Sequence, residues 1–130
     1  AIEGILDYGE RVEKPGLHLA QGPGNDLESV TGLAASGANL ICFSTGRGTI
    51  TGQAIVPVIK ISSTSSLYQS MPFDIDYNAG ALLDDPERHL ESMGDALFEC
   101  MLATASGQKT CSELNGQQQF QIWTAGKLSL

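Results

Sequence analysis

The sequence has few of the residues that mark nucleic-acid-binding, disulfide-rich or membrane proteins. Only seven of its 130 residues are Lys or Arg, against fifteen Asp and Glu, so the formal net charge is −8. Proteins that bind duplex nucleic acid gather basic side chains on one face, and this charge balance argues against that class. Three widely separated cysteines argue against a disulfide framework or a zinc site. No apolar run approaches the roughly 20 residues that span a bilayer, so we expect no membrane partner and a cytoplasmic location.

The residues that are present fit one small globular domain. Apolar residues make up 42% of the chain and charged residues 17%, a balance typical of folded proteins. A chain of this length predicts a single domain over residues 1–130, with residues 1–15 as a weakly helical lead-in. The sequence begins at Ala1 rather than at a methionine, and we expect it to be part of a longer, multidomain polypeptide.

Two strand-and-loop units follow one another in the first half of the chain. Residues 17–20 form a short apolar run before a glycine-rich loop, and Asn25 is placed to cap the helix that follows. Residues 38–43 are almost continuously apolar, which is typical of a strand buried in a parallel sheet. Residues 55–61 predict a further strand, in which Pro57 indicates an edge position or a bulge.

Helical signals dominate the second half. The clearest helix is expected over residues 86–106 with Asp85 as its N-cap, and shorter helices over residues 64–71 and from a capping box at Thr110. Residues 120–123 alternate in polarity, which predicts a strand with one wet face. One apolar face of the long helix is expected to pack on the sheet: Leu90, Met93, Leu97 and Met101.

Strands that alternate with helices predict an α/β fold. We expect three layers, with a mostly parallel sheet between helices on both faces, as in Rossmann and flavodoxin-like domains. If the strands at 17–20, 38–43 and 55–61 share this sheet, the loops after the first two meet at its carboxyl edge. Such folds bind ligands at that edge.

These two loops carry the candidate substrate-binding residues. Arg47 has a permanently charged guanidinium that can bind a carboxylate or phosphate through two parallel hydrogen bonds. Its neighbouring glycines let backbone N–H groups approach an anion, although a plain turn with a solvated arginine has the same pattern. Asn25 and Asp26 also have an ordinary interpretation as helix caps. The full candidate set is Asn25, Asp26, Thr45, Gly46, Arg47, Gly48 and Thr49.

Other reactive side chains have ordinary interpretations. Asp74 and Asp76 share one face of an extended segment and could hold a divalent cation, but such pairs commonly line the wet face of an edge strand. His18 is expected to be an internal, hydrogen-bonded histidine, and His89 a surface residue. No nucleophile–base pair is recognisable, so no catalytic residue and no metal ligand is assigned. The three cysteines are expected to be unreactive core residues: Cys42, Cys100 and Cys111.

Several segments, taken in order along the chain, carry a family resemblance. Together they resemble the C-terminal domain of the altronate and galactarate dehydratase family, with the altronate branch nearest. The galactarate and sulfolactate lyase branches stay open. The segments are residues 24–33, 37–39, 43–49, 55–60, 74–80, 105–110 and 120–123.

The resemblance implies a bacterial hydro-lyase that removes water from a sugar acid, D-altronate in the nearest branch, to give a 2-keto-3-deoxy acid. It also implies a divalent metal, typically Fe(II), whose ligands lie mostly in the N-terminal domains of the same chain, together with the catalytic base. In such an elimination, fixed cationic donors stabilise the charge that builds at the substrate carboxylate, a role that fits Arg47. The isolated 130 residues are then expected to be inactive, and a homo-oligomer is left open.

Two other functions stay open at this point. The loop at 44–49 is similar to the phosphate loop of flavodoxin-like domains, which would make the chain a phosphate- or flavin-nucleotide-binding module. Residues 50–53 are, however, poor formers of the helix whose N-terminus such a phosphate uses. The third interpretation is a structural domain that supports the catalytic part of an enzyme or its dimer.

Overall fold

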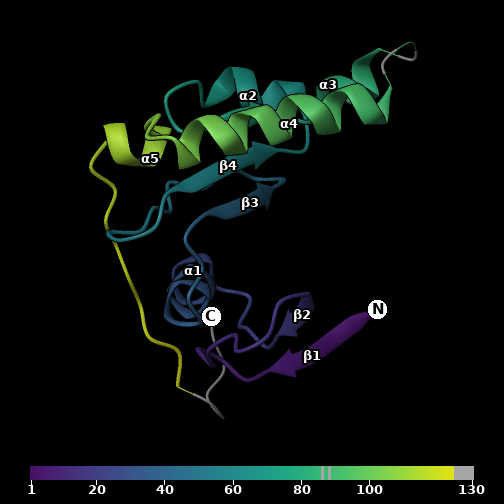
Figure 1. Ribbon diagram of the computed structural model, residues 1–130. Helices are drawn as coiled ribbons and strands as arrows, with labels where there is room; N and C mark the ends of the chain where they lie inside the picture. The colour runs from purple at the N-terminus through teal and green to yellow at the C-terminus, as the bar shows by residue number, and fades with distance from the viewer. Residues whose placement is uncertain (86, 88, 125–130) are drawn as a thin grey trace.

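The computed structural model describes residues 1–85, 87 and 89–124, in which the strands form two small parallel sheets (Figure 1). All the strand pairings are parallel, so the expected α/β fold with mostly parallel strands is confirmed. The first sheet pairs β1 (Ile2–Leu6) with β2 (Leu17–Ala20). The second has the order β3–β4–β5, with bounds Ile41–Thr45, Val58–Ser62 and Tyr77–Asn78.

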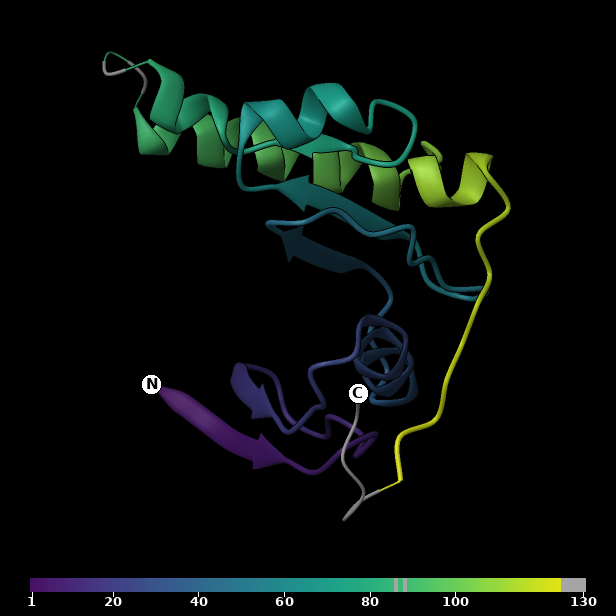
Figure 2. The ribbon, with the colours of Figure 1, turned by 180° about the vertical axis from the view of Figure 1, so that it is seen from behind.

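The helices are α1 (Asp26–Ala35), α2 (Ser65–Ser70), α3 (Ala81–Asp84), α4 (Leu90–Ala105) and α5 (Cys111–Leu114). Helix α1 lies between the two sheets, and α2, α3 and α4 lie beyond the second sheet (Figures 1 and 2). Two local predictions are confirmed. The short helix expected over residues 64–71 is present as α2, and Thr110 and Glu113 form the expected capping box at α5.

The expectation of one continuous sheet is wrong. β2 pairs with β1, which lies in the segment expected to be a helical lead-in, and not with β3. In this ladder Ile5 lies beside Leu19, and Leu6 beside Ala20. The spacing of the apolar residues in 1–15 could not reveal a partner strand further along the chain. That partner decides the structure because helix propensity is a weak preference that tertiary pairing overrides.

The core joins α1 to the second sheet. Val30 of α1 packs with Ile41, Val56 and Val58, all nearly free of solvent. Pro57 precedes β4, which is the central strand, so the predicted edge position is wrong. Proline is tolerated there because it stands before the first residue of the strand, where no ladder donor is lost.

The long helix begins later than expected, and one residue of its expected inner face is exposed. α4 begins at Leu90 with His89 as its N-cap, so Asp85 does not cap it, and the expected first helical residue, Pro86, lies outside the described residues. Leu90 is exposed, which corrects its predicted place on the inner face. Met93, Leu97 and Met101 are half-buried, and Tyr77 of β5 donates a hydrogen bond to the Met93 carbonyl oxygen at 2.7 Å.

The segment after α5 runs back across the molecule to the first sheet (Figure 1). Residues 120–123 form no strand, contrary to expectation, because side chains of α1 take their polar groups instead. The Gln121 backbone N–H donates to Thr31 Oγ1 at 3.1 Å, and the Gln121 side chain donates to Glu28 at 3.0 Å. The Trp123 ring meets Tyr8 edge to face, with centroids 5.4 Å apart. We call residues 117–124 the C-terminal strap.

Within the part of the chain that the structure describes, no helix combines the length and the apolar character that crossing a bilayer requires.

We expect Ile59→Ala in β4 to lower the free energy of unfolding by about 2–5 kcal/mol, because this side chain is 0% exposed and its removal leaves a cavity. The matched control is Ile55→Ala, where the side chain is 80% exposed and the change should stay within about 0.5 kcal/mol. Urea unfolding followed by far-UV circular dichroism measures both. Equal losses would show that β4 is not the centre of the core.

Candidate functional site

The carboxyl ends of the three strands of the second sheet meet at one edge. Thr45 at the end of β3 pairs with Ser62 at the end of β4, and Ser62 pairs with Asn78 at the end of β5. The loops that follow therefore all begin at the same edge. Open parallel sheets bind ligands at this position, so we call these strand ends and loops the carboxyl-edge site.

Arg47 is presented by a tightly closed turn after β3. The Gly48 backbone N–H donates to Thr45 Oγ1 at 3.0 Å. Gly48 has φ +88°, a conformation that favours glycine, and an added Cβ would also displace the Met71 side chain. The Arg47 side chain is exposed and has no hydrogen-bond or ion-pair partner among the described residues. Its guanidinium is thus available to an anion.

The threonines of this loop are used within the protein. Thr49 is buried, and its hydroxyl donates to Thr51 Oγ1 at 2.8 Å. Thr45 Oγ1 accepts the turn-closing bond from Gly48. These hydroxyls shape the loop, whereas the Arg47 side chain is exposed to solvent.

Sequence reasoning missed the polar residues that follow β4 and β5. Ser63 is exposed beside Gly46, where an added Cβ would lie 3.5 Å from its hydroxyl oxygen. Asn78 donates a hydrogen bond to Ser65 Oγ at 2.8 Å, and Gly80 lies so close to the Thr64 backbone that no side chain fits. The signal was the hydroxyl-rich run at 62–66, directly after a predicted strand.

The other predicted loop lies elsewhere. Asn25 Oδ1 accepts hydrogen bonds from the backbone N–H groups of Leu27 at 3.1 Å and Glu28 at 3.3 Å, so Asn25 caps α1. Asp26 is the first residue of that helix. β2 belongs to a different sheet, and its arrow points in another direction from that of β3 (Figures 1 and 2). The expectation that the loops after β2 and β3 share one rim is therefore wrong.

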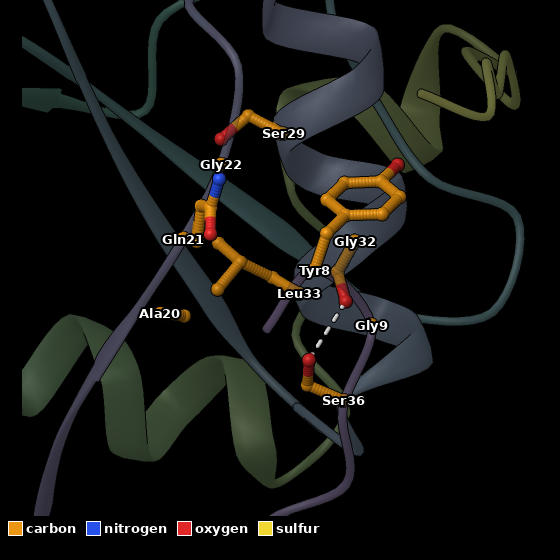
Figure 3. Close-up of a pocket in the computed structure, with 9 residues that line it drawn as sticks. All are labelled: Tyr8, Gly9, Ala20, Gln21, Gly22, Ser29, Gly32, Leu33 and Ser36. Atoms are coloured by element: carbon orange, nitrogen blue, oxygen red, sulfur yellow. Dashed lines mark hydrogen bonds between the residues drawn. The ribbon is translucent and has the colours of Figure 1, made fainter. Parts of the chain in front are cut away.

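The loop after β2 instead borders a small cavity against α1 (Figure 3). Gln21 and Gly22 line it together with Tyr8, whose ring leaves no room for a side chain at Gly32. Ser36 donates a hydrogen bond to the Gly32 carbonyl oxygen at 3.0 Å, as drawn in Figure 3. The cavity is about 40 Å³, which is room for water and too little for a sugar acid.

A buried lysine stands behind the carboxyl edge, and sequence reasoning also missed it. Lys60 in β4 is 0% exposed, and its Nζ donates to Gln117 Oε1 at 2.9 Å. The Gln117 amide donates in turn to Asp74 Oδ1 at 2.9 Å. Burial lowers the pKa of Lys60, while the carboxylates of Asp74 and Asp76 oppose this by raising it. A lowered pKa suits a general base, but no substrate reaches a side chain so enclosed.

The carboxylates of Asp74 and Asp76 accept hydrogen bonds from backbone N–H groups and from the Gln117 side chain. Asp76 accepts from the Lys60 backbone N–H at 2.8 Å with one oxygen and from the Cys111 N–H at 2.7 Å with the other. Both aspartates are half-buried, so the wet-face interpretation is wrong. Within residues 1–85, 87 and 89–124, no three His, Cys, Asp or Glu side chains are grouped as metal ligands. The described residues therefore do not fit a metal centre of their own.

The histidines and cysteines depart from expectation in detail. His18 is half-buried, with Nε2 2.9 Å from the Lys14 carbonyl oxygen, but its buried Nδ1 has no partner in the described part of the chain. It is therefore only half satisfied. His89 is exposed, as expected. Cys42 is exposed, and Cys100 and Cys111 are half-buried, which corrects the expectation that all three cysteines lie in the core.

Comparison with known proteins gives consistent matches. The family model described as "D-galactarate/Altronate dehydratase, C-terminal" matches residues 1–128. Altronate dehydratase of Bacillus subtilis is 38% identical over 125 residues, which cover 96% of this chain and 25% of that protein. Altronate dehydratase of Escherichia coli is 35% identical over 94% of this chain and 24% of its own length. Galactarate dehydratase (L-threo-forming) of E. coli is 40% identical over 84% of this chain and 21% of its own length. The chain thus spans about a quarter of the length of these relatives.

We expect Cys111 to resist alkylation at pH 8, because burial and then the negative charge of Asp76 raise the pKa of its thiol to about 11. Only the thiolate reacts, so iodoacetamide labelling should be about 100-fold slower than for an ordinary cysteine. Peptide mass spectrometry over pH 7–11 measures the rate. The urea-unfolded chain is the control, in which Cys111 should react as an ordinary thiol. Equal rates in the folded and unfolded chains would contradict the burial of this thiol.

Proposed function

This chain belongs to the D-galactarate/altronate dehydratase C-terminal family, and from that membership we propose that it is the C-terminal domain of a sugar-acid hydro-lyase. The proposed reaction removes water from D-altronate to give a 2-keto-3-deoxy acid. Two relatives that cover more than nine-tenths of the chain carry the name altronate dehydratase, which favours this substrate over galactarate.

The observation that carries the proposal is the exposed, unpartnered Arg47 at the carboxyl-edge site. A guanidinium binds a carboxylate through two parallel, charge-assisted hydrogen bonds, and the tight turn at Gly48 fixes the backbone that presents the arginine. During dehydration, removal of the proton next to the carboxylate spreads negative charge onto the carboxylate oxygens. A fixed cation there stabilises this charge more in the transition state than in the ground state. The hydroxyl of Ser63 lies beside the same loop and can bind a hydroxyl group of the substrate.

The rest of the machinery is proposed to lie outside these residues. The described side chains do not group as metal ligands, so the ligands of an Fe(II) ion and the catalytic base are assigned to the preceding domains of the same polypeptide. About three quarters of the length of the relatives lies outside the matched segment, which leaves ample chain to supply them. The proposed location is the cytoplasm, where the reducing environment keeps cysteines free, as Cys42, Cys100 and Cys111 are here.

The course of the chain after β3 weighs against the flavin-nucleotide alternative. Residues 46–57, between β3 and β4, form no helix, so the loop after β3 does not lead into a helix N-terminus. Substitution of Arg47 in the complete enzyme distinguishes a substrate-binding role of this domain from a purely structural one.

We expect Arg47→Ala in the complete enzyme to lower kcat/KM for D-altronate by about 10²–10³-fold, because one preorganised donor to the developing charge is lost. The kcat/KM of Arg47→Lys should lie between those of the unchanged enzyme and Arg47→Ala, since lysine keeps the charge but not the bidentate geometry. The matched control is Arg11→Ala, at another exposed arginine that lies outside the carboxyl-edge site, and this variant should leave turnover unchanged. Unchanged turnover in Arg47→Ala would make the loop architectural only.

We expect the isolated 130 residues to fold but to give no turnover when mixed anaerobically with Fe(II) and D-altronate. The physical reason is that Arg47 can donate to the substrate carboxylate, whereas the described residues include no group of metal ligands and Lys60 is fully buried. Formation of the 2-keto-3-deoxy acid is the measurement, with the complete enzyme as the positive control. Turnover that a chelator abolishes would show that the fragment contains a whole site.

A further inference from the structure

The two-stranded sheet leaves one apolar face uncovered. Ile5 pairs with Leu19, and Leu17 stands two residues before Leu19, so the three side chains share one side of the β1–β2 ladder. They are 79%, 50% and 61% exposed, respectively. We call these residues the β1–β2 face. The opposite side is covered better, because Leu6 there is buried.

Such exposure is unusual for parallel strands. Parallel sheets occur almost only where both faces are covered, and a sheet of two strands is marginal by itself. In the described part of the chain no third strand joins β1 or β2, and the ladder extends only from Ile2 to Leu6. The described residues therefore cover only one side of this two-stranded sheet, although parallel strands are normally covered on both.

The total exposed area points the same way. The chain exposes 8450 Å², whereas a compact monomer of 13.7 kDa exposes about 6,600 Å². The excess is larger than the roughly 800 Å² that one partner contributes to a standard protein interface. The area is that of the whole chain, and exposed apolar side chains outside the β1–β2 face, such as Leu83 and Leu90, contribute to it as well.

We propose that the β1–β2 face is the docking surface for the preceding part of the same dehydratase polypeptide, which lays an apolar layer over Ile5, Leu17 and Leu19. This inference rests on the proposed function, because it takes the chain to be the C-terminal quarter of a longer enzyme. A second copy of the chain suits the surface less well. Its net charge of −8 makes two copies repel each other, whereas an apolar segment of the same polypeptide is already held nearby.

Hydrogen–deuterium exchange of the complete enzyme and of the 130-residue chain tests this inference. Amides of residues 3–6 and 17–20 should exchange at least about ten-fold more slowly in the complete enzyme, because a covered face stabilises the ladder. The Ile59 amide in the core of the second sheet serves as an internal reference for folding in both samples. Equal exchange of the ladder in the two proteins, with the reference protected in both, would overturn the proposal.

Two variants of the complete enzyme locate the contact. Leu19→Glu should return exchange at 3–6 and 17–20 to the rates of the isolated chain, since a carboxylate cannot remain against an apolar layer. Leu83→Glu is the control, at an α3 residue that is 78% exposed and lies away from the β1–β2 face, and it should leave the ladder protected. Loss of protection in both variants alike, or in neither, would overturn the assignment of this face.

The outcomes separate this inference from the proposed function. A protected ladder in an enzyme that dehydrates no sugar acid would support the interface and overturn the function. Turnover with an unprotected ladder would support the function and overturn the interface. Protection that grows with the concentration of the isolated chain would identify a second copy as the partner, and would overturn the proposal as stated.

Discussion

The carboxylate of Asp76 is the constraint on which the second half of the structure depends. One oxygen accepts from the backbone of β4 at Lys60, and the other from the first residue of α5, Cys111. One side chain thus joins the central strand, the approach to β5 and the helix that covers them. Because β5 begins at the next residue, this anchor also fixes Asn78 at the carboxyl edge, two residues further on.

Sequence reasoning succeeded where the signals are local. The apolar run at 38–43 predicted β3, and the capping box at Thr110 predicted α5, because both depend on residues that are neighbours in the chain. It failed where a partner is distant. The pattern of residues 1–15 predicts a weakly helical segment where strand Ile2–Leu6 lies, and nothing local predicts the burial of Lys60, whose partner Gln117 lies 57 residues away.

The sequence predicts only part of the candidate site, because only part of it depends on residues that are neighbours in the chain. Arg47 and its glycines follow directly from the sequence, since a turn after a buried strand is a local pattern. The partners of this loop depend on which strands share a sheet, and that is decided by pairing between distant segments. The structure replaces the loop after β2 by the segments after β4 and β5, so Ser63 stands beside the arginine loop where Asn25 was expected.

The C-terminal strap has a consequence for the order in which the structure forms. Tyr8 and Trp123, which it brings together, are 115 positions apart, so this contact closes a very long loop. Closing so long a loop is entropically costly, and folds rich in distant contacts form slowly. The second sheet, whose strands are close in sequence, can therefore form before the strap closes against Tyr8 beside the first sheet.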